Sequence, residues 1–305
     1  MSAERRFHGV LAPVLTPFGE DGAPDADRFI EHCQWLLDEG CTGLAPFGTT
    51  SEGPSLGLDE RMELLEDLVD GGVDPGRLMP GTGSPSLADA IALTQHAVDV
   101  GCGGVLVLPP YYYKGPSEEG LLRFYAELIE EVADDRLKVY LYHFPRMTSV
   151  PLSLDLVGRL VAAYPGQIAG LKDSSGDIAN TKAVIAAFPG LEVFPGSEAL
   201  MAEALSAGGA GCISASANIA ARLIRQLYDR HGTAQAAEIG GRIDTLRAAI
   251  QRQPLIPFLK AVVAHHREDP QWRVVRPPLE PMAPAEAEMA VRELTERHGL
   301  VLDMG

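Results

Sequence analysis

Lys172 is the residue of this chain whose type and setting most directly suggest chemistry. It closes the apolar run at 168–171 and precedes the polar turn at 173–177. An amine at the mouth of a buried strand is poorly solvated, which favours the neutral, nucleophilic form. The pattern indicates a lysine that condenses with a carbonyl carbon to form a Schiff base. The alternative is a strand cap paired with Asp173 or Asp177, and this segment alone does not separate the two.

Other segments with reactive side chains also follow apolar runs: GTTSEG at 48–53, PPYYYK at 109–114 and YHFP at 142–145. The first offers hydroxyls and backbone N–H groups that could hold a carboxylate. Tyrosines beside an imine-forming lysine could shuttle protons, because one phenol oxygen both donates and accepts. Each segment also has a structural interpretation: a helix N-cap for the threonines, a packing or subunit contact for the tyrosines, a hydrogen bond for His143.

The rest of the chain predicts how these residues are positioned. Short runs of Val, Ile and Leu alternate with longer amphipathic segments, which is typical of βα units around a buried parallel sheet. About eight such units in about 230 residues predict an α/β fold, the (β/α)8 TIM barrel, whose active face follows the strands. A doubly wound sheet is the alternative, but no GxGxxG loop follows the first strand. We predict strands at 9–14, 43–47, 78–81, 104–108, 138–142, 168–171, 191–194 and 211–213, and helices that include 25–39, 59–71, 87–100, 118–133 and 154–163.

Strand patterns stop near residue 233. Helical patterns follow at 234–251, 257–266 and 285–298. We therefore predict a barrel domain over 1–232 and a C-terminal helical region, an appendage to the barrel, over 233–305. The proline-rich stretch at 270–284 carries Trp272, Val274 and Val275, which favours an ordered connector.

Composition excludes several classes of function. A formal charge of −17 argues against nucleic acid or an anionic membrane as a partner, because binding to either requires a basic surface. No signal-peptide stretch precedes the first strand, and no apolar run approaches the ~20 residues of a membrane span, so we expect a cytoplasmic protein. The four cysteines lack CxxC spacing and lie among apolar or small residues. That spacing predicts free thiols and no structural metal.

Taken together, the segments resemble the dihydrodipicolinate synthase and N-acetylneuraminate lyase family, the pyruvate-dependent class I aldolases and lyases. The resemblance implies the barrel with its helical tail, an imine on lysine in place of a bound cofactor, and commonly a homotetramer built as a dimer of dimers. It covers nearly the whole chain. It rests on VLAPVLTPF at 10–18, GTTSE at 48–52, GTG at 81–83, PPYYYKG at 109–115, YHFP at 142–145, GLKDSSGD at 170–177, and GCIS at 211–214 with Asn218.

The resemblance also implies roles for single residues. Lys172 matches the lysine that forms the imine with pyruvate, and Tyr142 matches the tyrosine that shuttles protons at the keto carbon. Thr49 and Tyr112 match the relay that connects Tyr142 to solvent. Tyr111 matches the aromatic residue that reaches across a subunit contact.

Further matches concern the keto-acid pocket. Thr50 and the backbone of Thr49 match the family residues that bind the pyruvate carboxylate. The Ile213 carbonyl and Gly196 match residues that line the same pocket. A protonated imine is an electron sink, so it lets a methyl proton leave or a C–C bond break without a metal. The expected partners are therefore pyruvate and an aldehyde.

Departures from the family pattern concern the second substrate. The synthases usually carry an arginine for aspartate semialdehyde where this chain has Met147, and a thioether cannot replace a guanidinium. Arg146, one residue earlier, could substitute. Tyr113 stands where the synthases generally have Asn and sugar-acid lyases often have Tyr. Ser51 and Glu198 could add polar groups near the substrate tail.

These departures favour a Schiff-base aldolase or lyase for a 2-keto-3-deoxy sugar acid, with pyruvate as one partner and an uncharged or hydroxylated aldehyde as the other. Three alternatives stay open. One is a 4-hydroxy-tetrahydrodipicolinate synthase that uses Arg146. Another is a keto-acid dehydratase or decarboxylase acting through the same imine. The last is a non-catalytic keto-acid binding protein.

Overall fold

The strands of the chain run parallel and curve into a barrel. The computed structural model describes residues 6–300 and 302. The paired strands within them follow the orders β2-β1-β7 and β3-β4-β5-β6, and every pairing is parallel. They are β1 (Gly9–Ala12), β2 (Gly43–Leu44), β3 (Val105–Val107), β4 (Val139–His143), β5 (Ile168–Asp173), β6 (Glu192–Pro195) and β7 (Gly211–Ile213).

Residues 78–81, predicted as a strand, join the two sheets. Leu78 bridges to β2 and Gly81 bridges to β3, both in parallel. On the opposite side, the backbone N–H of Ala210 donates to the carbonyl of Val193 at 2.9 Å and links β6 to β7. The barrel is thereby closed, and the predicted (β/α)8 TIM-barrel fold is confirmed.

Two of the predicted strands end early, for local reasons. β1 ends at Ala12, because the next residue is Pro13, which has no N–H to donate to a ladder. β2 ends at Leu44, close to Pro46 and to Phe47, whose φ of 61° takes the chain out of the extended region. The chain therefore leaves the barrel wall just before the Thr49–Thr50 segment.

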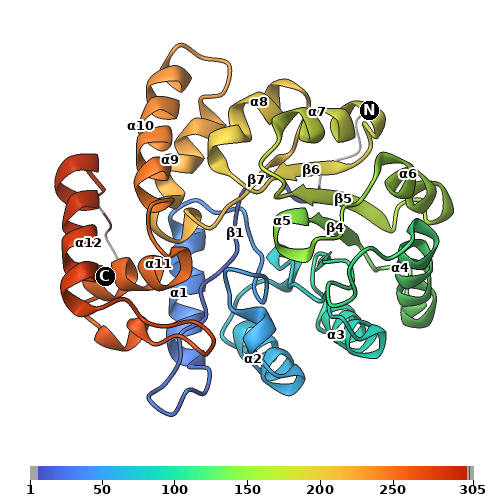
Figure 1. Cartoon of the computed structure of the whole chain (residues 1–305), viewed down its shortest axis with the longest axis horizontal. Helices are drawn as coiled ribbons and strands as arrows, with labels where there is room; N and C mark the ends of the chain where they lie inside the picture. The colour runs from blue at the N-terminus through green and yellow to red at the C-terminus, as the bar shows by residue number, and fades with distance from the viewer. Residues whose placement is uncertain (1–5, 301, 303–305) are drawn as a thin grey trace.

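Helices surround the strands, as Figure 1 shows. Asp25, Ser86, Ser117 and Ser153 each accept a backbone N–H in the first turn of a helix, which is how N-cap side chains start helices. These helices are α1 (Ala26–Asp38), α2 (Leu58–Asp70), α3 (Leu87–Val100), α4 (Glu118–Val132), α6 (Leu154–Ala163), α7 (Ile178–Ala187), α8 (Met201–Ser206) and α9 (Ala217–Asp229), with the short α5 (Pro145–Thr148) at the rim. Single 3-10 turns are η1 (Gly53–Ser55), η2 (Pro75–Arg77) and η3 (Glu198–Leu200).

The barrel interior is filled at the end where the strands begin. Phe7 precedes β1, is buried, and packs edge-on against Tyr140 with ring centroids 5.5 Å apart. The Tyr140 hydroxyl donates to Glu192 at 2.6 Å, which satisfies both buried polar groups. The core is therefore closed at that end, and the carboxyl ends of the strands are left for a site.

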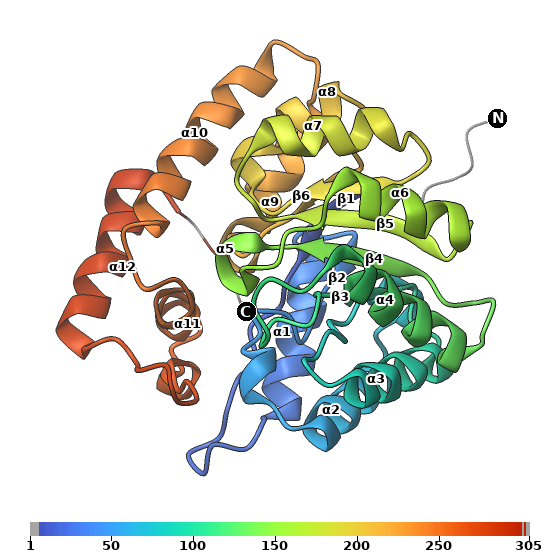
Figure 2. The same cartoon turned by 45° about the vertical axis from the view of Figure 1, so that its right-hand side comes forward.

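The C-terminal helices lie together on one side of the barrel (Figures 1 and 2). They are α10 (Gln235–Ile250), α11 (Leu255–His266) and α12 (Pro284–His298), with η4 (Pro270–Arg273) in the predicted connector. Each matches its predicted range within a few residues, and Trp272 is buried as an ordered connector requires. The boundary predicted at 232/233 falls between α9 and α10, and the division into two domains stays a prediction.

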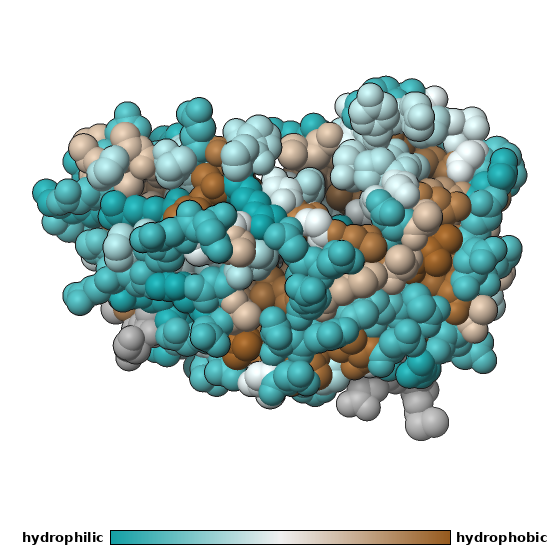
Figure 3. Space-filling model, turned by 90° about the horizontal axis from the view of Figure 1, so that it is seen from below, coloured by the Kyte–Doolittle hydropathy of each residue, from teal (hydrophilic) through white to brown (hydrophobic). Residues whose placement is uncertain are grey.

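The face seen in Figure 3 is covered mostly by hydrophilic side chains, with apolar residues between them in small patches. Within the described part of the chain, no helix is long and apolar enough to cross a membrane.

Candidate active site

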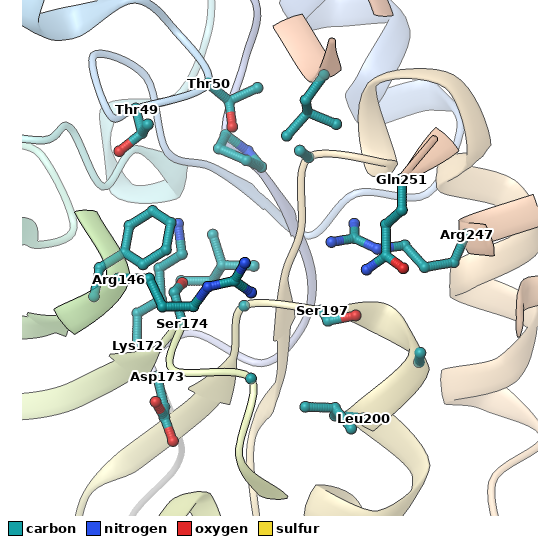
Figure 4. Close-up of a pocket in the computed structure, with 18 of the residues that line it drawn as sticks. Thr49, Thr50, Arg146, Lys172, Asp173, Ser174, Ser197, Leu200, Arg247 and Gln251 are labelled. Atoms are coloured by element: carbon teal, nitrogen blue, oxygen red, sulfur yellow. The ribbon is translucent and has the colours of Figure 1, made fainter. Parts of the chain in front are cut away.

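A cavity of about 660 Å³ opens at the carboxyl ends of the strands. Strand β4 contributes Tyr142, β5 contributes Lys172, and the loop after β2 contributes Thr49 and Thr50. Figure 4 shows how these elements converge. The other lining residues are Pro13, Phe144, Arg146, Met147, Asp173, Ser174, Gly176, Gly196, Ser197, Ala199, Leu200, Ile213, Ala215, Asp244, Arg247, Ala248, Gln251 and Leu255.

Lys172 and Tyr142 are direct neighbours across two adjacent strands. They are paired in the β4–β5 register, and the Lys172 Nζ lies 4.2 Å from the centroid of the Tyr142 ring. Only 4% of Lys172 and 3% of Tyr142 are exposed, and both line the cavity. An amine and a phenol thus face the same enclosed space.

The carboxylates that follow Lys172 are engaged elsewhere. Asp173 accepts hydrogen bonds from the Ser175 N–H at 2.9 Å, the Asn180 amide at 2.9 Å and the Thr181 hydroxyl at 2.7 Å. Asp177 caps α7. Among the described residues, Lys172 has no ion-pair partner within 4.0 Å, so the strand-cap alternative lacks its carboxylate.

The loop that carries Thr49 and Thr50 is held by buried polar contacts. The Thr16 hydroxyl donates to the Ser51 carbonyl at 2.7 Å. Glu52 has a left-handed φ of 55°, and its carboxylate is fully buried 2.5 Å from the equally buried Lys260 Nζ of α11. The C-terminal helices therefore anchor the loop. Ser51 is fully buried and is absent from the cavity lining, so the expectation that it serves the substrate tail is not met.

Gly196 and Ile213 also line the cavity, as the resemblance implies. A Cβ on Gly196 would lie 2.2 Å from the Ser174 Oγ and 2.9 Å from the Ser174 Cβ, so a larger residue would require the turn after Lys172 to shift. Its N–H donates to the Asp173 carbonyl at 2.6 Å. Arg146 reaches the cavity from α5 and has no hydrogen-bond or ion-pair partner among the described residues.

The structure does not bring all of the predicted residues to this cavity. Tyr112 and Tyr113 are 73% and 76% exposed and pack on each other with ring centroids 5.5 Å apart. Tyr111 is partly buried in a smaller adjoining cavity of about 140 Å³, which Thr49 and Tyr142 also line. Burial raises the pKa of Tyr111, and the nearby Arg61 partly offsets this. Their predicted roles stay predictions.

His143 and Glu198 lie behind the cavity wall. His143 is buried, and its Nδ1 accepts the Leu152 N–H at 3.0 Å. Burial lowers the pKa of His143, and nearby Asp173 opposes that shift. Glu198 is 1% exposed and accepts a hydrogen bond from the Ser214 hydroxyl. Neither side chain is among the cavity-lining residues, so each reaches a substrate only through a neighbour.

The sequence prediction missed a wall of the cavity that α10 supplies. Asp244, Arg247, Ala248 and Gln251 are spaced i, i+3, i+4 and i+7 and so share one helix face. The spacing was readable from the sequence. The docking of that face over the barrel mouth was not, because it depends on the packing of α10 against α9 and η3.

The cavity and the fold define an enzyme of the (β/α)8-barrel class, and comparisons with known proteins identify its family. The model of the Dihydrodipicolinate synthetase family matches residues 6–297. A protein of Chloroflexus aurantiacus named an uncharacterized DapA-like lyase is 36% identical over 95% of this chain and 96% of its own length. The 4-hydroxy-tetrahydrodipicolinate synthase of Rhizobium meliloti is 33% identical over 81% of this chain and 84% of its own.

Comparisons with solved structures identify the same family. The dihydrodipicolinate synthase of Agrobacterium tumefaciens superimposes with a TM-score of 0.87 at 31% identity, covering 95% of this chain and 99% of that one. YagE of E. coli K12, solved with pyruvate, gives 0.87 at 28% identity, covering 97% and 99%. The chain belongs to the dihydrodipicolinate synthetase family. It is an enzyme of the aldolase and lyase type, which confirms the family and enzyme class predicted from the sequence.

Proposed function

We propose that the protein is a Schiff-base (class I) aldolase or lyase that cleaves or forms a 2-keto-3-deoxy sugar acid, with pyruvate as one partner. The observation that carries the proposal is the Lys172–Tyr142 pair: a buried amine with no carboxylate partner among the described residues, 4.2 Å from a phenol ring. The resemblance to a relative solved with pyruvate supports the choice of keto acid.

The expected reaction uses residues that line the cavity. Lys172 attacks the keto carbon, water leaves, and the protonated imine withdraws electrons from the adjacent bonds. Tyr142 takes the proton from the substrate hydroxyl, and the C3–C4 bond breaks to release an aldehyde. The resulting enamine is protonated and hydrolysed to pyruvate and free Lys172. Thr50 and the Thr49 backbone N–H hold the keto-acid carboxylate, and no separate cofactor takes part in this scheme.

Trapping of the imine tests the proposal. Borohydride added to the protein with pyruvate reduces an imine to a stable amine, which peptide mass spectrometry locates. We expect the adduct on Lys172 and none in Lys172→Ala. An adduct on another lysine, or no adduct, contradicts the proposal.

A second candidate is a 4-hydroxy-tetrahydrodipicolinate synthase, in which Arg146 takes the place of the missing arginine. It is favoured by the position of the Arg146 side chain, which lines the cavity without a partner among the described residues. Activity with pyruvate and aspartate semialdehyde that Arg146→Ala abolishes would support it. Dehydration or decarboxylation of a keto acid through the same imine would appear as a different product in these assays.

The proposal includes a homotetramer built as a dimer of dimers. Tyr112 and Tyr113 support it, because two adjacent exposed tyrosines suit a subunit contact better than open solvent. The cytoplasmic location stays a prediction.

A further inference from the structure

The α10 wall (Asp244, Arg247, Ala248 and Gln251) lies across the cavity from Thr49 and Thr50, which are predicted to bind the keto-acid carboxylate. Figure 4 shows Thr49 and Thr50 on one side of the space and Arg247 and Gln251 on another, with Lys172 below the threonines. A keto acid bound to Lys172 with its carboxylate at Thr50 would therefore extend its tail toward the remaining walls. The groups on those walls decide which tail fits.

Arg247 is the most firmly positioned of these groups. Its Nη1 donates to the Ser216 hydroxyl at 3.2 Å and lies 3.5 Å from the Glu198 Oε2. Glu198 is itself held by the Ser214 hydroxyl. These contacts use one edge of the guanidinium, while 17% of the side chain stays exposed and lines the cavity. A buried carboxylate thus fixes an arginine that also lines the cavity, and the Arg247 Nε is buried without a hydrogen-bond partner among the described residues.

Arg146 supplies a second guanidinium from the opposite side. It lines the same cavity, and Figure 4 shows Arg146 and Arg247 reaching into the space from opposite sides. Glu198 offsets the charge of Arg247, but no carboxylate pairs with Arg146 within the described residues. Asp244, one turn before Arg247, also lines the cavity; both Asp244 and Arg146 are exposed, so water and salt screen both charges.

We propose that Arg247 and Arg146 bind an anionic group, a carboxylate or a phosphoryl group, at the far end of the keto-acid substrate. Guanidinium groups match the geometry of these anions, and charge-assisted hydrogen bonds are stronger than neutral ones. Glu198 then acts as a positioning residue for Arg247. The inference rests on the proposed function and replaces the uncharged aldehyde expected from the sequence by one with an acidic end.

Three keto acids that differ only at C6 test it: 2-keto-3-deoxygluconate (CH2OH), its 6-phosphate, and 2-keto-3-deoxyglucarate (COO⁻). The readout is the concentration of each that gives half-maximal borohydride-trapped adduct on Lys172. For the wild type we expect an acidic C6 group to lower this concentration by about 10- to 100-fold. Whichever acidic compound binds more tightly identifies a carboxylate or a phosphoryl group.

Arg247→Met and Arg146→Met should each weaken binding of the acidic compounds far more than binding of the neutral one, and so remove most of that preference. Arg247→Lys, which keeps the charge, should keep part of it. Arg242→Met is the matched control, because Arg242 is exposed on the same helix but is not among the residues lining the cavity. The control should behave like the wild type.

The outcomes separate the two proposals. If pyruvate and the neutral compound are trapped on Lys172 but acidic compounds bind no better, or if the preference survives both methionine variants, this inference is wrong and the proposed function stands. If no compound, pyruvate included, is trapped on Lys172, the proposed function itself fails.

Discussion

Tyr142 and Lys172 owe their arrangement to one register match between neighbouring strands. Residues paired across two strands point to the same side of a sheet, so the β4–β5 pairing places the phenol beside the amine inside the barrel. Because both residues lie on strands, their relative position does not depend on a loop. This arrangement is compatible with the role of proton carrier that we propose for Tyr142.

Replacement of this phenol should slow turnover more than it weakens binding. We expect Tyr142→Phe to lower kcat by about 100-fold or more, because general acid–base groups contribute ~10²–10⁴ to rates. The ring and its stacking on Phe144 remain, so the fold should be unchanged. Steady-state pyruvate release and circular dichroism check this. A normal kcat would remove Tyr142 from the mechanism.

Single residues also show what the sequence could predict. Lys172, Tyr142, Thr49, Thr50, Gly196 and Ile213 all line one cavity, because each follows or ends a barrel strand and motif reading locates such positions. His143 ends β4 and Glu198 follows β6, but neither side chain is among the residues lining the cavity. Which way a side chain points at a strand end depends on the local backbone, and the sequence does not give it.

At the scale of elements, the contact between the Thr49–Thr50 loop and α11 has a direct consequence. Lys260 is fully buried between Glu52, the Val274 carbonyl at 2.7 Å and the Phe18 ring at 4.3 Å. The Arg276 N–H donates to the second Glu52 oxygen at 2.9 Å. Removal of one partner of a buried ion pair strongly destabilises the fold, because the other charge is left buried and unpaired.

We therefore expect Lys260→Met to lower the free energy of unfolding by about 3–5 kcal/mol, since it leaves the Glu52 charge unpaired. It should also raise the pyruvate concentration needed to form the imine, because the loop carrying Thr50 loses its anchor. Urea unfolding and adduct titration measure the two effects. The double variant Lys260→Met with Glu52→Gln should recover part of the stability. Unchanged stability and unchanged titration in Lys260→Met would show that the pair anchors nothing.

His32 makes a second contact between elements, and it depends on pH. It lies on α1 within hydrogen-bonding distance of Asn218, 3.2 Å away, and packs edge-on against Trp272 with ring centroids 4.9 Å apart. Burial and then the charge of Arg267 lower the pKa of His32 to about 3. Between pH 3 and the ordinary value of about 6.5 the unfolded chain binds the proton and the folded chain does not. This residue therefore makes stability fall as pH falls through that window.

From pH 7 to pH 5 the loss due to His32 should be about 2 kcal/mol. His32→Gln keeps a donor for Asn218 but does not titrate. The free energy of unfolding of this variant should therefore fall less than that of the wild type over the same interval. Urea unfolding at the two pH values gives the difference. Equal losses in both proteins would mean that His32 is not the titrating group.

The elements were easier to predict than their packing. Repeated βα patterns gave the barrel, and the helical ranges of the C-terminal region were close to those observed. The α10 wall was missed because a helix face with Asp244, Arg247 and Gln251 resembles an ordinary solvated face. Only its contact with η3 and α9 turns it into part of the site.

At the scale of the whole molecule, the exposure of Tyr112 connects its predicted role in the relay with the predicted assembly. It is 73% exposed and is not among the residues lining the cavity of its own chain. If it belongs to the relay, as the family resemblance implies, it must reach the cavity of another copy. A tetramer would then complete the site and would also cover Tyr113.

Sedimentation should accordingly give a mass four times that of the chain. Lys172→Ala, inactive alone, and Tyr112→Phe, weakly active alone, should together regain part of the activity when the chains are mixed and reassembled. In some hybrid sites, Lys172 of one copy would meet Tyr112 of another. A fully active monomer would contradict both the assembly and the relay.

Trapping of the pyruvate imine tests the central claim most directly. The wild-type protein is incubated with pyruvate, reduced with borohydride, digested and analysed by mass. The Lys172–Tyr142 geometry predicts one pyruvyl adduct, on Lys172, which is absent from Lys172→Ala while that variant keeps its circular dichroism spectrum. A wild-type protein that turns over its keto acid with Lys172 unmodified would contradict the Schiff-base mechanism, even though the barrel and the family assignment would stand.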